Sequence, residues 1–167
     1  MNTTKKMRFY LFLMVWPLLY SCKHDEAEFA MRDDQFIDSV YPEMQYQQQL
    51  NLELQKIPGR TDLNNLGYKR SENNQTYIKE LTTNTGVAVP LTLKEEHIQN
   101  LAVLRRQDPV LLAELQSLLV DSDQRMIGFH VRASGSTGLV NADMRNWAEK
   151  KLYYWTADLK EIQDLAK

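Results

Sequence analysis

The sequence predicts an all-α protein, an antiparallel bundle of four long helices with an additional short helix after the second. Three observations carry this prediction. From about residue 33 onwards, apolar residues recur at intervals of three and four, which is the period of an amphipathic helix. Proline and glycine divide this pattern into segments of helical length. No segment alternates apolar and polar residues as a strand would, and long amphipathic helices joined by short turns favour a bundle.

The first long helix is predicted over Asp34–Lys56. Phe36, Val40 and Met44 lie four residues apart and begin an apolar stripe that continues to the end of the segment. Pro42 is expected to kink this helix or to restart it, because proline removes one backbone hydrogen bond and crowds the preceding turn.

The second long helix is predicted to start at a cap formed by Thr61 or Asp62 and to stop at Gly86. Val87–Pro90 is then a short extended connector. The additional short helix is predicted over Leu93–Arg106.

The fourth helical segment is predicted to begin at Asp108-Pro109, a cap followed by proline at the first helical position, and to end near residue 133. Gly135–Gly138 breaks the chain, and the last long helix starts at Asn141. Among the apolar residues expected to face the core are Ile98 on the short helix and Leu111 on the fourth segment.

Residues 1–21 predict a signal peptide that precedes the bundle. Lys5, Lys6 and Arg8 stand before the apolar run Phe9–Tyr20, whose twelve residues are fewer than the roughly 20 that a spanning helix needs. This arrangement resembles a bacterial lipoprotein signal, in which Cys22, the only cysteine, becomes the lipidated first residue. The alternatives are an ordinary signal peptide cut elsewhere and an uncleaved anchor.

The residues after Cys22 predict a second targeting signal. Lys23-His24-Asp25-Glu26 resembles the export signal of surface lipoproteins in the Bacteroidota. We therefore expect an outer-membrane lipoprotein of the cell envelope, periplasmic or surface-exposed, with residues 22–32 as a tether and residues 33–167 as the helical bundle domain.

The charge of the mature chain argues against a nucleic-acid partner. The whole sequence has 20 basic and 22 acidic residues, and removal of Lys5, Lys6 and Arg8 with the signal peptide leaves 17 against 22. A mildly acidic domain has no cationic field that would hold a polyanion. Attachment to the membrane is therefore expected through the lipid on Cys22.

Three motifs occur in an order that points to a family. Asp34-Gln35-Phe36 opens the first helix, His97 lies seven residues after the end of Gly86-Val87-Ala88-Val89-Pro90, and Met144-Arg145-Asn146-Trp147-Ala148 opens the last helix. This order resembles the domain-of-unknown-function family 4142, predicted exported bundles with a ferritin-like fold. The resemblance covers nearly all of residues 33–165 and implies an antiparallel ferritin-like four-helix bundle.

The resemblance also directs attention to histidines. Where the family commonly carries histidine on its second, long third and last helices, this chain has polar residues near Ser71–Asn74, near Gln124 and at Asp158. Only His97 stays in register. Any metal-linked role of the relatives' histidines would therefore lack most of its ligands in this chain.

The ligand pattern of a bundle di-iron site is also missing. Such a site needs inward glutamates, two of them followed three residues later by histidine. The residues three before His97 and His130 are Lys94 and Ile127. We therefore predict no metal site and no cofactor.

Both histidines receive a structural interpretation. His97, beside Glu95-Glu96, could hold a metal at the surface, but a capped or solvent-facing histidine on a short helix is the favoured prediction. His130 lies near the end of its helix, where a cation would be stabilised by the helix dipole.

No catalytic residue is predicted. Ser136 sits in a glycine turn without the spacing of a nucleophile or phosphate-binding motif. Acidic pairs such as Asp121 and Asp123, and the run Gln45–Gln49, are expected to be solvated helix faces.

Aromatic residues crowd the last helix and, beside His97, are the candidates for a binding surface. Trp147, Tyr153, Tyr154 and Trp155 cannot all share one stripe at about 100° per residue. The two tryptophans are expected in the core and the two tyrosines at the rim, where exposed aromatics could bind a sugar or a partner protein.

Three functions follow as hypotheses from these observations. The preferred one is a lipid-anchored, non-catalytic helical bundle with a binding or envelope-stress role. The alternatives are a metal-binding or oxidoreductase ferritin-like protein, which rests on the resemblance alone, and a surface glycan-binding protein that uses Tyr153 and Tyr154.

Overall fold

The computed structural model describes residues 30–87, 92–107 and 110–165. The predicted signal peptide, Cys22 and the tether up to residue 29 lie outside the described residues. The same holds for residues 88–90 of the predicted connector and for Asp108-Pro109.

The described part of the chain is all-helical, as the sequence predicts. It contains five helices: α3 (Asp33–Leu54), α4 (Thr61–Thr85), α5 (Glu95–Arg105), α6 (Leu112–Ser134) and α7 (Ala142–Asp164). Its only strand-like pairing is an isolated parallel bridge between Met31 and Leu139. None of these helices is both long enough and apolar enough to cross a membrane.

Local chemistry accounts for two of the helix ends. Gly86 ends α4 in the left-handed conformation with φ 66°, and its N–H donates to the Thr82 carbonyl oxygen over 2.9 Å. The Asn141 side chain caps α7 by accepting from the backbone N–H groups of Asp143 and Met144. The predicted cap at Thr61 or Asp62 is wrong, because the N-cap position of α4 is Arg60.

Pro42 does not restart the first helix, because α3 runs through it from Asp33 to Leu54. Proline removes one intrahelical hydrogen bond. The residues on either side, Tyr41, Glu43 and Met44, are buried, and their packing holds the helix together across that lost bond.

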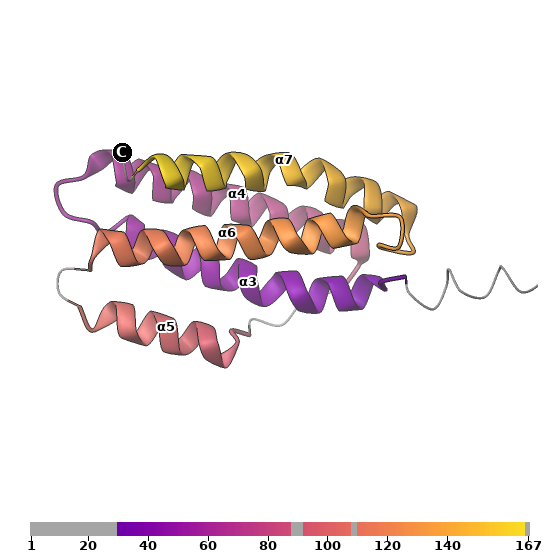
Figure 1. Ribbon diagram of the computed structural model, residues 1–167, viewed down its shortest axis with the longest axis horizontal. Coiled ribbons are helices and arrows are strands. Elements are labelled where there is room, and N and C mark those ends of the chain that lie inside the picture. Colours follow the sequence, from indigo (N-terminus) through magenta and orange to yellow (C-terminus); the bar gives the residue numbers. More distant parts are fainter. Residues whose placement is uncertain (1–29, 88–91, 108–109, 166–167) are drawn as a thin grey trace, which may run out of the picture. The chain divides into compact units, whose positions relative to one another are not determined.

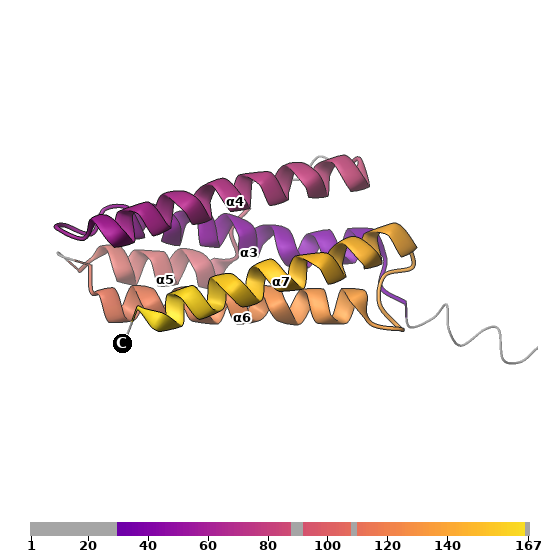
Figure 2. The same cartoon turned by 90° about the horizontal axis from the view of Figure 1, so that it is seen from above.

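The helices lie side by side with alternating directions (Figure 1, Figure 2). α3 packs against α4, α5 and α6, and α7 packs closely on α6 but meets α4 at few points. α4 and α6 run in the same direction, so the chain must return along the bundle between them. The short helix α5 provides that return.

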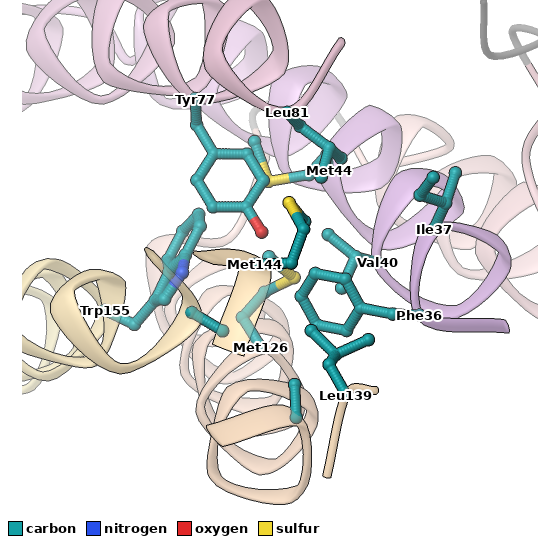
Figure 3. Close-up of a cluster of buried hydrophobic side chains, with 12 residues drawn as sticks. Phe36, Ile37, Val40, Met44, Tyr77, Leu81, Met126, Leu139, Met144 and Trp155 are labelled. Atoms are coloured by element: carbon teal, nitrogen blue, oxygen red, sulfur yellow. The ribbon is translucent and has the colours of Figure 1, made fainter. Parts of the chain in front are cut away.

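The buried apolar side chains form two clusters at opposite ends of the long helices. The first cluster includes Phe36, Val40, Met44, Met126 and Met144, several of which meet in Figure 3. The second contains Tyr46, Leu50, Leu54, Leu63, Leu66, Leu101, Leu104, Leu115, Leu119 and Ile162.

Two apolar residues predicted to face the core are exposed instead. Ile98 is 47% exposed because α5 turns only one narrow face, with Leu101 and Leu104, toward the bundle. Leu111 is 57% exposed because it is the N-cap of α6 and precedes the packed part of that helix.

Candidate binding site

A layer of buried polar side chains separates the two apolar clusters. Each long helix contributes to it at core-facing spacing, so the position on the helix, and not the polarity of the side chain, determines burial. The members, which we call the polar layer, are Gln47 and Asn51 on α3, Arg70 and Asn74 on α4, Asp123 on α6 and Asp158 on α7.

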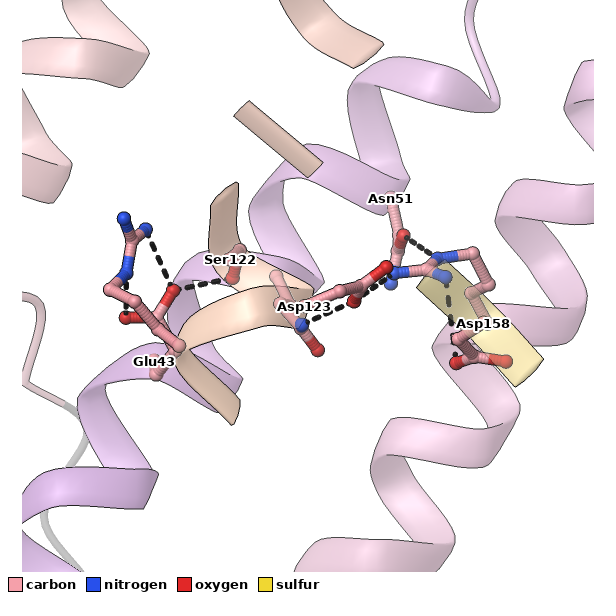
Figure 4. Close-up of polar contacts among 8 residues, drawn as sticks. Glu43, Asn51, Ser122, Asp123 and Asp158 are labelled. Atoms are coloured by element: carbon pink, nitrogen blue, oxygen red, sulfur yellow. Dashed lines mark hydrogen bonds and ion pairs between the residues drawn. The ribbon is translucent and has the colours of Figure 1, made fainter. Parts of the chain in front are cut away.

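Arg70 is the centre of the polar layer. Its Nη2 donates to Oδ1 of Asp123 over 2.7 Å and its Nε donates to Oδ1 of Asn51 over 3.1 Å. Its Nη1 lies 3.5 Å from Oδ2 of Asp158. Asn51, Asp123 and Asp158 therefore converge on one guanidinium that is 1% exposed (Figure 4).

The carboxyl groups of Asp123 and Asp158 share the single guanidinium of Arg70, and burial changes the pKa of both. Burial raises the pKa of Asp123 to about 6, although the charge and hydrogen bond of Arg70 act against the rise. Burial raises the pKa of Asp158 as well, again opposed by Arg70. With both carboxyls ionised, the buried group of three carries a net negative charge, which a low-dielectric interior disfavours.

Glu43 forms a second buried polar cluster, beside the layer. Burial by itself raises the pKa of its carboxyl, but contacts with His97, Arg125 and Ser122 outweigh this effect and lower the pKa to about 2. Arg125 binds both carboxylate oxygens at 2.8 and 2.9 Å, and the Ser122 hydroxyl donates to Oε1. Glu43 is therefore a buried anion at neutral pH.

His97 is buried, and the prediction of a solvent-facing residue is wrong. Its ring stacks on Tyr46 with centroids 4.3 Å apart, and its Nε2 lies 3.3 Å from Oε2 of Glu43. The cause is its register on α5, where it precedes Leu101 by four residues and shares the inward face of the helix. His97 therefore attaches α5 to α3.

His130 is neutral, and the prediction of a cation that interacts with the helix dipole is wrong. Burial lowers its pKa to about 4. Its Nδ1 lies 2.7 Å from the carbonyl oxygen of Met126, so this nitrogen must be the donor. Its Nε2 then accepts a hydrogen bond from the Tyr77 hydroxyl over 2.8 Å.

A groove of about 170 Å³ lies between α4 and α7. The side of α4 that lines it is Asn73, Asn74, Thr76, Tyr77 and Glu80. The side of α7 is Lys151, Tyr154, Trp155 and Asp158. Asn74 and Asp158 belong to both the groove and the polar layer, so the groove opens onto the buried polar interior.

Two groove residues carry buried donors that have no hydrogen-bond partner among the described residues. These are Nδ2 of Asn74, whose residue is 1% exposed, and Nε1 of Trp155, whose residue is 3% exposed. An unpaired buried N–H costs about 1–3 kcal/mol.

The charged groups at the groove are paired across it. Lys151 Nζ lies 2.6 Å from Oε2 of Glu80, which also accepts from the indole N–H of Trp147 over 2.9 Å. Burial raises the pKa of Glu80, but Lys151 and Trp147 outweigh this effect and lower it. Glu80 and Lys151 therefore form a neutral pair of charges among the residues that line the groove.

The structure separates the two tyrosines that the sequence placed together. Both are exposed, Tyr153 at 78% and Tyr154 at 54%, but only Tyr154 lines the groove. Trp155 is in the core, as predicted, and Trp147 is half-buried against it.

Several site residues were not predicted from the sequence, chiefly Arg70, Asn74 and Asp123. The sequence predicts Asp123 on a solvated helix face, and this prediction is wrong because the residue is fully buried. Among the described residues, no three His, Cys, Asp or Glu side chains lie where they could hold a metal ion.

Comparison of the chain with protein-family models, curated proteins and solved structures found no match.

Proposed function

We propose that this chain is a lipid-anchored outer-membrane lipoprotein of the cell envelope whose helical domain binds a small ligand in the groove between α4 and α7, without converting it chemically. In this proposal the helices form a ferritin-like four-helix arrangement, with α5 as the connection between its second and third members.

The observation that carries the binding role is a pair of unpaired buried donors on two residues that line the groove. Asn74 Nδ2 and Trp155 Nε1 lack partners although both residues are more than nine-tenths buried. Interiors rarely leave such groups unsatisfied without a reason. A bound acceptor supplies one, because it restores the missing hydrogen bonds.

We propose a role without catalysis because the ionisable groups that line the groove are held in contacts with other side chains. Glu80 is held by Lys151 and Trp147, and Asp158 faces Arg70. A general acid or base must be able to exchange a proton with its substrate. Groups that are fixed in ion pairs are better suited to hold a ligand in place.

The binding half can be tested with the indole signal of Trp155. Full-length protein labelled with ¹⁵N in its tryptophan side chains is titrated with neutral, anionic and cationic single-ring compounds in detergent micelles. A ligand in the groove should shift the Trp155 Nε1–H resonance, whereas the Trp147 N–H, already bonded to Glu80, should move less.

A matched pair of variants locates the effect. Asn73 is exposed on the rim, so Asn73→Phe should fill the groove and abolish the shift. Glu72→Phe places the same ring one residue away, outside the groove, and should leave the shift unchanged. The binding role is rejected when no compound of any class shifts Trp155, or when Asn73→Phe has no effect.

The anchor half has a separate test. Fatty-acid labelling of the protein in growing cells should be lost in Cys22→Ser and retained in the parent. Labelling that persists unchanged in the variant would contradict the lipoprotein assignment and leave the binding role standing.

A further inference from the structure

We propose that the groove between α4 and α7 binds one ring of a neutral saccharide, with ring hydroxyls between Asn74 and Asp158 and a carbon face against Tyr154. This inference rests on the proposed binding function and names the ligand class for the same groove.

The size of the groove limits the ligand to one ring. Its volume is about 170 Å³. A cavity of about 150 Å³ holds one benzene molecule, so a single six-membered ring fits and a second does not. Further units of an oligosaccharide would leave the groove past Asn73 and Thr76, which are exposed at its rim.

The hydrogen-bonding groups of the groove match a hydroxyl. Asn74 Nδ2 and Trp155 Nε1 need acceptors, whereas the carboxylate of Asp158 is itself an acceptor. A hydroxyl accepts from an N–H and donates its own proton to a carboxylate at the same time. A ring that carries several neighbouring hydroxyls can satisfy all three groups.

The charges of the groove disfavour ionic rings. An anionic ligand would accept from the two N–H groups but would lie beside the carboxylates of Asp158 and Glu80. A cationic ligand would donate to Asp158 but would leave both N–H groups unpaired and would lie beside Lys151. Glu80 and Lys151 already neutralise each other at 2.6 Å, so this pair compensates neither the charge of an anionic ligand nor that of a cationic one.

Tyr154 supplies the apolar wall that a sugar ring needs. Lys151 Nζ lies over its ring, 4.7 Å from the centroid, and restrains its orientation, while Tyr154 lines the groove and is 54% exposed. Saccharides combine hydroxyl edges with C–H faces, and aromatic rings provide broad apolar area at low entropic cost.

The ligand experiment compares three sugars that share one ring and differ in charge. Full-length protein in micelles is titrated with glucose, glucuronate and glucosamine, and binding is followed by calorimetry and by the Trp155 indole resonance. N-acetylglucosamine is added as a second neutral sugar. We expect the neutral sugars to bind about tenfold more tightly than the ionic ones. The reason is that the hydroxyl groups of a neutral sugar can pair with both the donors and the acceptor of the groove residues.

The variant experiment assigns the site. Tyr154→Ala and Asn74→Leu should each weaken neutral-sugar binding about tenfold. Asn74→Leu also removes an unpaired buried amide, so the variant should fold. Tyr68→Ala, which removes an exposed tyrosine of α4 outside the groove, should bind as the parent does.

The outcomes separate this inference from the proposed function. Neutral sugars that fail to bind, or that bind equally well to Tyr154→Ala and Asn74→Leu, overturn the saccharide assignment. If a charged ring compound shifts Trp155 and this shift is lost in Asn73→Phe, the groove binds a ligand but the saccharide class is wrong. If no ring compound shifts Trp155, both proposals fail.

Discussion

Replacement of Asp123 by asparagine should change how stability depends on pH. The Asp123 carboxyl is fully buried and accepts from Gln47 and Arg70, and asparagine can keep both contacts through its side-chain oxygen. What it cannot do is ionise. The variant therefore isolates the free energy of ionising this buried carboxyl, which burial disfavours and Arg70 favours.

The magnitude follows from the pKa of Asp123, which is about 6 in the folded protein against a model value of 3.8. A difference of about two units corresponds to about 3 kcal/mol. Between these values the folded protein binds a proton that the unfolded chain has lost, so stability falls as pH rises. The stability that the protonated Asp123 carboxyl provides, relative to its ionised form, is fully present below about pH 4 and is lost above about pH 6.

The assay is urea unfolding, followed by far-UV circular dichroism, from about pH 3.5 to about pH 7.5. Relative to Asp123→Asn, the parent should lose about 3 kcal/mol of unfolding free energy over this range. Asp121→Asn, which removes an exposed carboxylate two residues away, is the control and should follow the parent. A difference between parent and Asp123→Asn that does not vary with pH would refute the reasoning.

Four further substitutions test the packing. Arg70→Met should destabilise the protein by about 3–5 kcal/mol at neutral pH, since it leaves two carboxyls buried without their cation, and a smaller loss in urea unfolding would contradict this. Gly138→Ala should lower the melting temperature, because its Cβ would lie 2.1 Å from a carbonyl oxygen of α6, whereas Gly128→Ala, with open space around it, should raise stability by about 0.5–1 kcal/mol. Tyr77→Phe removes the donor to His130 and should cost about 1–3 kcal/mol in the same assay, with an unchanged midpoint as the contrary result.

The helices were predictable because their signals are local. The spacing of Phe36, Val40 and Met44 and the glycine at position 86 each determine structure within a few residues, and both agree with α3 and α4. The start of α5 is two residues later than predicted, at Glu95. Helix ends depend on a balance of weak capping contacts, so such small errors are expected.

The polar layer does not follow from polarity, because polarity alone predicts exposure. Gln47 and Asn51 continue the stripe that Val40 and Met44 begin, and Arg70 and Asn74 lie between Leu66 and Tyr77 on the same face of α4. The available signal was therefore this register, a polar residue in a core-facing position. Gln45–Gln49 shows the same error, since Tyr46 and Gln47 are buried on the central helix α3.

The groove shows what register alone can and cannot determine. Lys151, Tyr154, Trp155 and Asp158 follow one another at intervals of three, one and three, which places them on one face of a helix, and that face is visible in the sequence. The same spacing excludes Tyr153, which is turned about 100° away from Tyr154. The sequence does not show which helix lines the groove from the other side, because that depends on α5 returning the chain so that α4 and α7 line one groove. One face of a helix can thus be read locally, whereas the proposed binding site, which Asn74 and Asp158 line from two helices, exists only once the long-range packing has brought these helices together.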